Sequence, residues 1–581
     1  MAPQRSIAIF ADPARRVVHA PQRPATTARI NGVFTPAVRV APILSDTLPR
    51  SPPIRSRMRL LPATIALVLA VAVSAAPAQQ RLPDIGSSAD TMLGPAQQRE
   101  YGQMLLAQLR HYDYILDDPL IDSWLRHMGN RLAEASDQPG QPFTFFMIKD
   151  RSVNAFATLG GYIGTNAGLV LIADSEDEVA GVLAHEVAHV TQAHVLRGAE
   201  RAQRDSIPIL LAMLGAMAVA SQTSSDSAGN AAVAAVAGAQ GLMLQRRIDY
   251  TRSNESEADR VGMRTLARSG YDTTAMARMF EHMQALSRTN QGGERERMPD
   301  YLRTHPVTTV RISEARQLAE QHADEHRGNF STVGLAGNNP LLPPLLRPGA
   351  PGAASGNQFG WARERLRALS AETPARAIAE YGRLSRSGEL TAPQRYGLAV
   401  AQLLAGQGAE AARGFEALLA SSPGDTWLLL GLARAESRQG LHAAADARYE
   451  DLVRRMPRNR AVVLGYAETL VERNNAESGR RAQDILRPLM AASGEDPVFH
   501  HIFARASDSA GDPIRAGEAW AEHAFLNGRA EQALLQLNTL RKRDDLDYYA
   551  RARIDARIAA ITPTVLELRR QGIRDPDLHR R

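Results

Sequence analysis

The chain has 581 residues, which is too long for one hydrophobic core and predicts two or three domains. Its apolar content of 44% with only 5% aromatic residues favours a mostly helical globular protein. The formal charge of +6 arises at the start: residues 1–78 contain ten arginines and two aspartates, which leaves a net charge of −2 for the rest. This near-neutral body excludes nucleic acid as an expected partner. Cysteine is absent from the sequence, which excludes disulfides, thiol catalysis and Cys-ligated zinc.

Residues 58–78 have the pattern of a secretory signal peptide. Arginines at positions 55, 57 and 59 precede an apolar run that ends at Val73, and Ala76-Pro77-Ala78 supplies the small residues of a cleavage site. The run is too short to favour a permanent membrane anchor. Cleavage would make Gln79 the first residue, and the Pro- and Arg-rich residues 1–57 would then be an over-extended start.

The segment after the leader is expected to be helical, and a strand is expected to follow it. Residues 95–135 have helical periodicity, Pro139-Gly140 breaks it, and residues 143–148 alternate as a strand does. The glycine-rich extended segment that follows is either a strand edge that binds a second backbone or an ordinary hairpin with turn glycines. The candidate binding residues in this segment are Asn154, Ala155, Phe156, Gly160, Gly161 and Tyr162.

A His-Glu-x-x-His motif lies in the next predicted helix. Ser175 and Glu178 form a capping box, and apolar residues follow at helical spacing, so the motif sits on a buried helix. Residues four apart share a helix face, so His185 and His189 can present two imidazoles to one metal ion, with Glu186 beside them. In that arrangement a zinc ion lowers the pKa of water, and the adjacent carboxylate takes its proton as general base. The motif predicts a zinc peptidase with one Zn²⁺ per chain.

Two apolar stretches follow, at residues 207–220 and 231–244. Each has about fourteen residues, fewer than the roughly twenty needed to span a bilayer. The region 207–244 is therefore expected to be a helical hairpin that covers the active site, lies on a membrane surface as a peripheral contact, or is buried in the core.

The helix predicted from Tyr250 to Gly270 offers the remaining carboxylates. Glu255 and Asp259 are four apart and share a face, while Glu257 points elsewhere. One of the pair can be the third metal ligand and the other can hydrogen-bond a ligand histidine. The spacing leaves open which is which, and acidic residues at a helix start also favour the helix dipole.

His305 lies between Thr304 and Pro306, in a segment expected to be extended, just before a helix that begins near Thr308. It can hydrogen-bond the tetrahedral intermediate, occupy a fourth zinc position or be structural.

Residues 338–358 form a Pro/Gly-rich linker, after which a repeat begins. Gly397, Gly431 and Gly465 are spaced by 34 residues, and Pro423 and Pro457 have the same spacing. This is the tetratricopeptide period, which predicts helix-turn-helix units stacked into a superhelix with a concave binding face.

Together these motifs resemble the HtpX-like and CAAX-prenyl-protease-like zinc metallopeptidases of family forty-eight. Within that family they are most similar to the exported BepA type, which joins a peptidase domain to tetratricopeptide repeats. Leu159 stands where many relatives carry Pro before the double glycine. The resemblance is carried by Asn154-Ala155-Phe156-Ala157 with Gly160-Gly161, His185-Glu186-x-x-His189, Arg252-x-x-Glu255-x-x-x-Asp259, and Thr304-x-Pro306 followed by Arg311-Ile312.

The resemblance implies a role for each site residue. It implies that His185, His189 and Glu255 bind zinc, that Glu186 is the general base and Asp259 the supporting acid, and that His305 can join the zinc and hold the enzyme latent. It also implies a role in the periplasm of a Gram-negative bacterium. The substrates would be unfolded or misassembled outer-membrane polypeptides, and the repeats would contact the outer-membrane assembly machinery.

We therefore expect an α+β, mainly α, zincin-like metallopeptidase domain at residues 90–330 and an all-α tetratricopeptide-repeat superhelix at residues 360–570. The leading hypothesis is a periplasmic zinc endopeptidase. The alternative is a latent protease that acts mainly as a chaperone or assembly factor.

Overall fold

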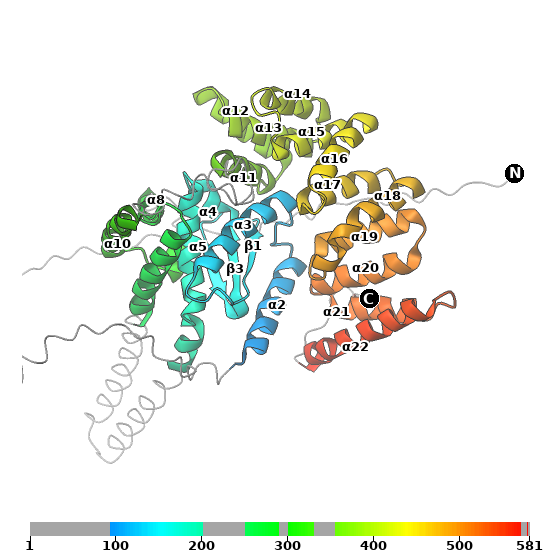
Figure 1. Ribbon diagram of the computed structural model, residues 1–581, viewed down its shortest axis with the longest axis horizontal. Coiled ribbons are helices and arrows are strands. Elements are labelled where there is room, and N and C mark those ends of the chain that lie inside the picture. The colour runs from blue at the N-terminus through cyan, green and yellow to red at the C-terminus, as the bar shows by residue number, and fades with distance from the viewer. Residues whose placement is uncertain (1–92, 202–249, 290–299, 330–354, 571–577, 579–581) are drawn as a thin grey trace, which may run out of the picture. The chain divides into compact units, whose positions relative to one another are not determined.

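The computed structural model describes residues 93–201, 250–289, 300–329, 355–570 and 578 (Figure 1). These residues are mainly helical with one three-stranded sheet, which confirms the expected mainly helical fold with a small sheet. The predicted signal peptide, the region 207–244 and most of the predicted linker lie outside the described residues.

The segment expected to be helical over residues 95–135 consists of two helices, α2 (Pro95–His111) and α3 (Pro119–Ala135). The chain turns at Asp113, which has a φ of 59°, and α3 begins anew at Asp118, whose carboxylate accepts a hydrogen bond from the backbone N–H of Ile121. Pro119 then occupies the first helical position, where a missing N–H costs nothing.

The sheet has the strand order β1-β3-β2. Strands β1 (Thr144–Ile148) and β3 (Tyr162–Asn166) are parallel, and β2 (Ala155–Thr158) pairs antiparallel with β3. The turn η2 (Leu159–Gly161) joins β2 to β3, so the glycine-rich segment is a hairpin and β2 is an edge strand of the sheet.

The two turn glycines are needed for their conformation and for space. Gly160 and Gly161 have φ values of 77° and 83°, where a side chain is unfavourable. A Cβ on Gly160 would lie 2.6 Å from the carbonyl oxygen of Gln98, and one on Gly161 would lie 2.2 Å from that of Pro142. These glycines therefore let α2 and the approach to β1 pack against the turn.

After the short helix α4 (Ala167–Ile172), the motif helix α5 (Glu176–Thr191) runs through the core, with α3 and the sheet against one side and α8 (Thr274–Thr289) against another (Figure 1). The Oγ of Ser175 accepts a hydrogen bond from the N–H of Glu178 at 3.3 Å, as the capping box predicts. The Glu178 carboxylate instead accepts from the N–H of Asp174, one residue earlier than the predicted box requires. Helical turns at 194–201 and 250–268, α9 (Asp300–Thr304) and α10 (Thr309–Asn329) complete this part.

The second part is a succession of helices that pack against their neighbours in sequence. Gly397, Gly431 and Gly465 occupy equivalent positions, because a Cβ on each would meet an aromatic side chain of the preceding helix, namely Tyr381, Phe415 and Tyr449 in turn. The helices are α11 (Ser355–Leu369), α12 (Pro374–Ser387), α13 (Ala392–Leu404), α14 (Gly408–Leu419), α15 (Thr426–Arg438), α16 (His442–Arg455), α17 (Arg460–Val471), α18 (Ala476–Leu486), η5 (Arg487–Ala492), α19 (Pro497–Ala510), α20 (Pro513–Leu526), α21 (Ala530–Arg541) and α22 (Tyr548–Arg570).

Ion pairs and a shared core join the two parts, which belong to one compact unit, Pro83–Arg581. Arg365 of α11 makes two hydrogen bonds of 2.6 and 2.8 Å to the carboxylate of Asp118, and Arg460 of α17 reaches Asp122 at 3.0 Å. Trp124 of α3 and Phe359 of α11 belong to the same apolar cluster. The chain has no cysteine, and these contacts hold its two parts together.

Candidate metal centre

The motif helix and the helix at 250–268 cross closely beside His185. A Cβ on Gly262 would lie 3.0 Å from the backbone nitrogen of His185, so glycine is needed for this approach. Gly262 was not singled out from the sequence. Its one signal is a glycine in the interior of a predicted helix, where glycine is otherwise unfavourable.

Four side chains from three segments converge at this crossing. Ligand atoms of His185, His189, Glu255 and His305 all lie within 4.8 Å of one another. The Nε2 atoms of the two motif histidines are 2.9 Å apart. The Oε2 atom of Glu255 lies 3.4 Å from that of His185, and its Oε1 atom lies 3.5 Å from that of His189. Two imidazoles and a carboxylate are a donor set typical of zinc sites.

Asp259 and Arg311 hold His185 from behind. The carboxylate of Asp259 lies 2.9 Å from Nδ1 of His185 and accepts hydrogen bonds of 2.7 and 2.8 Å from the Arg311 guanidinium. Arg311 also reaches Glu255 at 2.9 Å, so one buried cation serves both carboxylates. The structure thus separates the two acidic residues that the spacing left open, since Glu255 faces the cluster and Asp259 faces the back of His185.

The pKa values follow from this arrangement. Burial would lower the pKa of His185, but its hydrogen bonds to Asp259 and Glu255 outweigh burial and raise that pKa to about 9. Burial and the neighbouring His185 hold the pKa of His189 well below its ordinary value. Burial would raise the pKa of Glu255, yet hydrogen bonds from His185 and His305 lower it. A ligating imidazole must be neutral, so metal binding would displace the proton of His185.

Glu186 is buried, and neither of its carboxylate oxygens has a hydrogen-bond partner among the described residues. Its Oε1 lies 3.8 Å from Nε2 of His305. Burying a carboxylate without a hydrogen-bond partner costs free energy, so we infer that a cation or a water molecule is held beside this side chain. The residues present therefore fit a divalent metal.

His305 follows directly after α9, and its N–H donates a 2.8 Å hydrogen bond to the carbonyl oxygen of Tyr301. The segment that holds His305 was expected to be extended, but α9 runs up to Thr304 and ends just before the residue that precedes Pro306. The imidazole stacks on the Tyr301 ring, with centroids 4.8 Å apart, and its Nδ1 lies 2.9 Å from Glu255. Tyr301, which sequence reasoning did not weigh, thus positions His305.

The residues proposed for substrate binding fall into two groups. Ala155 and Phe156 lie on the edge strand β2, and Asn154 precedes it with its side-chain oxygen buried and unpartnered among the described residues. Gly160 and Gly161 lie in the turn against α2, and Tyr162 is buried beside Leu106 and Phe146.

A second group of potential ligands, Asp174, Glu178 and His282, lies near the start of α5. The guanidinium of Arg278 contacts Glu178 at 3.2 Å, so this carboxylate already has a cation.

The helices that the structure describes include none with the length and apolar character of a membrane span.

Comparison with known proteins identifies a peptidase family over the part of the chain that contains this site. Residues 119–319 match the model of peptidase family M48. The chain is 30% identical over 492 residues to a beta-barrel assembly-enhancing protease of Yersinia pestis. The aligned residues make up 83% of this chain and 92% of that protein. It is 28% identical over 503 residues to the beta-barrel assembly-enhancing protease of Escherichia coli (strain K12), with 84% and 92% covered. It spans about half, 54%, of a Vibrio cholerae relative that is 36% identical over 270 residues.

The fold and the site define a metalloendopeptidase of family M48. Within that family the chain belongs to the group of the beta-barrel assembly-enhancing proteases, which confirms the resemblance seen in its motifs.

Proposed function

We propose that this enzyme is a zinc-dependent endopeptidase that is exported to the periplasm and hydrolyses unfolded or misassembled outer-membrane polypeptides. One observation carries the catalytic part: a three-residue donor set, His185, His189 and Glu255, lies beside the buried Glu186, which has no hydrogen-bond partner among the described residues. The relatives' printed name supports the substrate class, and the leader pattern of residues 58–78 supports export.

In this proposal the metal ligands, Glu186 and Asp259 have separate roles in hydrolysis. Zinc held by the three ligands would supply a Lewis acid for water and for the scissile carbonyl. Glu186 accepts the proton of the attacking water and passes it to the leaving amine. Asp259, held by Arg311, accepts the Nδ1 proton of His185, so that Nε2 keeps its lone pair for the metal. Burial of the whole set excludes bulk water and strengthens these interactions.

Casein degradation by the purified, zinc-loaded chain from Gln79 tests this function. Glu186→Gln removes the base but no proposed ligand, so it should keep its zinc and lose turnover by about 10²- to 10⁴-fold. His185→Ala should lose zinc as well, as metal analysis would show. Undiminished hydrolysis by Glu186→Gln would overturn the proposed role of this residue.

We also propose that the edge of β2 binds the substrate backbone as an added strand. Its side away from β3 has no strand partner among the described residues, and Asn154, Ala155 and Phe156 line it. Gly160, Gly161 and Tyr162 would act indirectly, by fixing the hairpin that places this edge.

His305 supports the latent form of the enzyme. A third imidazole within the cluster can complete a four-residue set, and closed sets of this kind are structural or inactive whereas catalytic zinc sites keep one position open. His305→Ala should therefore raise casein hydrolysis by the zinc-loaded chain. Unchanged hydrolysis with unchanged zinc content would show that His305 does not gate the site.

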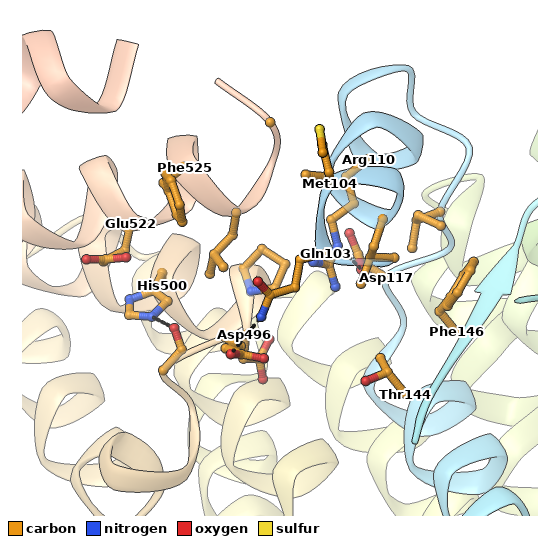
Figure 2. A pocket seen from close by; sticks show the side chains of 18 of the residues that line it. Gln103, Met104, Arg110, Asp117, Thr144, Phe146, Asp496, His500, Glu522 and Phe525 are labelled. Carbon is orange, nitrogen blue, oxygen red and sulfur yellow. Dashed lines mark hydrogen bonds and ion pairs between the residues drawn. The ribbon is translucent and has the colours of Figure 1, made fainter. Parts of the chain in front are cut away.

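The helical part favours a second activity, the holding of partner polypeptides. The recurring glycine and aromatic contacts every 34 residues support the assignment of tetratricopeptide repeats. A cavity of about 1410 Å³ lies between α2, β1 and the helices from α19 onward (Figure 2). Gln103 and Met104 of α2 and Thr144 and Phe146 of β1 face it from one side. We propose that unfolded outer-membrane chains, or components of the assembly machinery, are held here.

The wall that β1 contributes suits an extended partner. The backbone of Met147 and Lys149 is paired with that of Leu116 and Tyr114, but residues 144–146 at the other end of the strand line the cavity. An extended polypeptide could add to this end of the edge strand.

Photocrosslinking tests the cavity. A photoreactive amino acid at Gln103, inside the cavity, should crosslink to a purified, unfolded outer-membrane β-barrel protein. The same group at Tyr101, exposed on α2 and not part of the cavity wall, is the control. Equal crosslinking at both positions would contradict the proposal.

A further inference from the structure

The second motif histidine has a hydrogen-bond chain of its own. Nε2 of His189 faces the cluster, while its Nδ1 lies 2.8 Å from Nδ1 of His194, a buried side chain. Nε2 of His194 lies 3.1 Å from the carboxylate of Glu257, which Arg197 contacts at 2.7 Å. This series of hydrogen bonds thus connects the metal ligand His189, through the imidazole of His194, to a carboxylate and an arginine.

Only one arrangement of protons satisfies every link when His189 is a ligand. Ligation through Nε2 requires a lone pair there, so the proton of the neutral ring sits on Nδ1 and is donated to His194. Nδ1 of His194 must then accept, which places its own proton on Nε2, facing Glu257. Glu257 accepts this proton and keeps its ion pair with Arg197. The geometry therefore selects the ligating tautomer of His189.

The first motif histidine has a shorter version of the same device. Nδ1 of His185 meets Asp259 directly, and Arg311 holds that carboxylate. Both ligand imidazoles thus lead to a carboxylate paired with an arginine, and the one difference is that His194 is inserted between His189 and Glu257.

The backbone is arranged to place His194. Helix α5 ends at Thr191, and Ala193 has a φ of 51°, a left-handed conformation that is unfavourable for residues other than glycine. This turn starts a new helical segment at His194 and directs its ring back toward His189. Arg197 follows His194 by three residues, so both lie on the side that meets Glu257.

We propose that His194 and Glu257 are positioning residues that fix the tautomer and ring orientation of the metal ligand His189. The inference rests on the proposed metal site. Glu257 does not share a helix face with Glu255 and Asp259, yet in this proposal it supports the same metal centre. His194 supports it too, although it lies outside the His-Glu-x-x-His motif.

Zinc affinity of the chain from Gln79, measured by competition with a chromogenic chelator, tests this inference. His194→Ala should weaken zinc binding about 10- to 100-fold, the range typical for loss of a group that supports a metal ligand. His194→Gln should restore part of that loss, because its amide oxygen can accept from His189 and its amide N–H can donate to Glu257. Glu257→Gln keeps an acceptor and should lose less than His194→Ala.

Two further measurements separate positioning from folding. The unfolding midpoint of the metal-free variants shows whether the fold is intact, and the visible spectrum of the cobalt-loaded chain reports ligand geometry. His127→Ala, at an exposed histidine of α3, is the matched control and should bind zinc as the unaltered chain does. If the unaltered chain binds zinc and a folded His194→Ala variant binds it equally well with the same cobalt spectrum, this inference is wrong. If the unaltered chain binds no zinc, the proposed metal site itself fails.

Discussion

The candidate metal centre and the helical part of the chain are stabilised in contrasting ways. At the metal centre, buried polar side chains from α5, the helix at 250–268 and the segment around His305 meet once, and each contact is unique. In the repeats the same contact between a glycine and an aromatic ring recurs every 34 residues. Removal of one side chain from the metal centre should therefore leave buried charges without a partner. A substitution at one of the recurring glycines should act only locally, and the space around that glycine should decide how far it changes stability.

Asp259→Ala should have the largest effect. It removes the partner of His185 and one of the two carboxylates that contact the buried Arg311, and loss of one member of a buried ion pair costs about 3–5 kcal/mol. Urea unfolding of the metal-free chain would measure this loss. Asp259→Asn keeps the shape and one acceptor and should lose less. A loss below about 1 kcal/mol in the alanine variant would show that the centre is not the interdependent network described.

Gly431→Ala should have a smaller, local effect in the repeats. The new Cβ would lie 2.6 Å from the ring of Phe415, and such overpacking costs about 1–3 kcal/mol. Gly465→Ala is the matched control at the equivalent position, because its Cβ would lie 3.7 Å from the ring of Tyr449, an ordinary contact. It should stabilise the chain by about 0.5–1 kcal/mol through helix propensity. Equal thermal shifts for both variants would show that local space does not decide the outcome.

Asp122, on α3 where it meets α17, should give the smallest effect and a pH dependence. Burial raises the pKa of Asp122 to about 7, and the negative charge of Asp117 adds to this increase. Arg460, which lies 3.0 Å away, lowers the pKa but does not outweigh burial. A folded-state pKa above the ordinary 3.8 means that the protonated form favours folding. This stability is complete below pH 3.8 and is lost as the pH rises through about 7.

Asp122→Asn cannot ionise and should lose none of this stability as the pH rises. Between pH 6 and pH 8 the free energy of unfolding of the unaltered chain should therefore fall by about 1.4 kcal/mol relative to that of the variant. Chemical denaturation at the two pH values measures the difference. A constant difference would mean that Asp122 titrates alike in the folded and unfolded chains.

Local patterns in the sequence predicted the elements that carry the site. The capping residue Ser175 and the helical spacing of the motif predicted a buried helix with His185 and His189 on one face, and the 34-residue period predicted equivalent helices. The helix prediction is confirmed, because it depends on contacts within a few residues. The glycine and aromatic contacts recur at the predicted interval, and the tetratricopeptide assignment itself stays a prediction.

Other features depend on how distant segments pack. The segment that holds His305 was expected to be extended, but the short helix α9 runs up to Thr304. Such a helix has little local signal and is held by tertiary contacts such as the hydrogen bond from the N–H of Tyr301 to the carbonyl oxygen of Val153. The parts played by Gly262 and Tyr301 likewise exist only where another segment approaches them.

The sequence by itself determined the chemistry available to this protein: two imidazoles and a carboxylate on one helix, further carboxylates on a second helix, a histidine before a proline and a helical repeat. Only the tertiary structure decided that Glu255 turns to the cluster while Asp259 and Arg311 stand behind His185, and that His194 stands behind His189. The physical reason is that spacing along a helix fixes which side chains share a face. Which of them meets a ligand and which supports it depends on the angle and distance at which two helices cross, and residues far apart in the sequence set both.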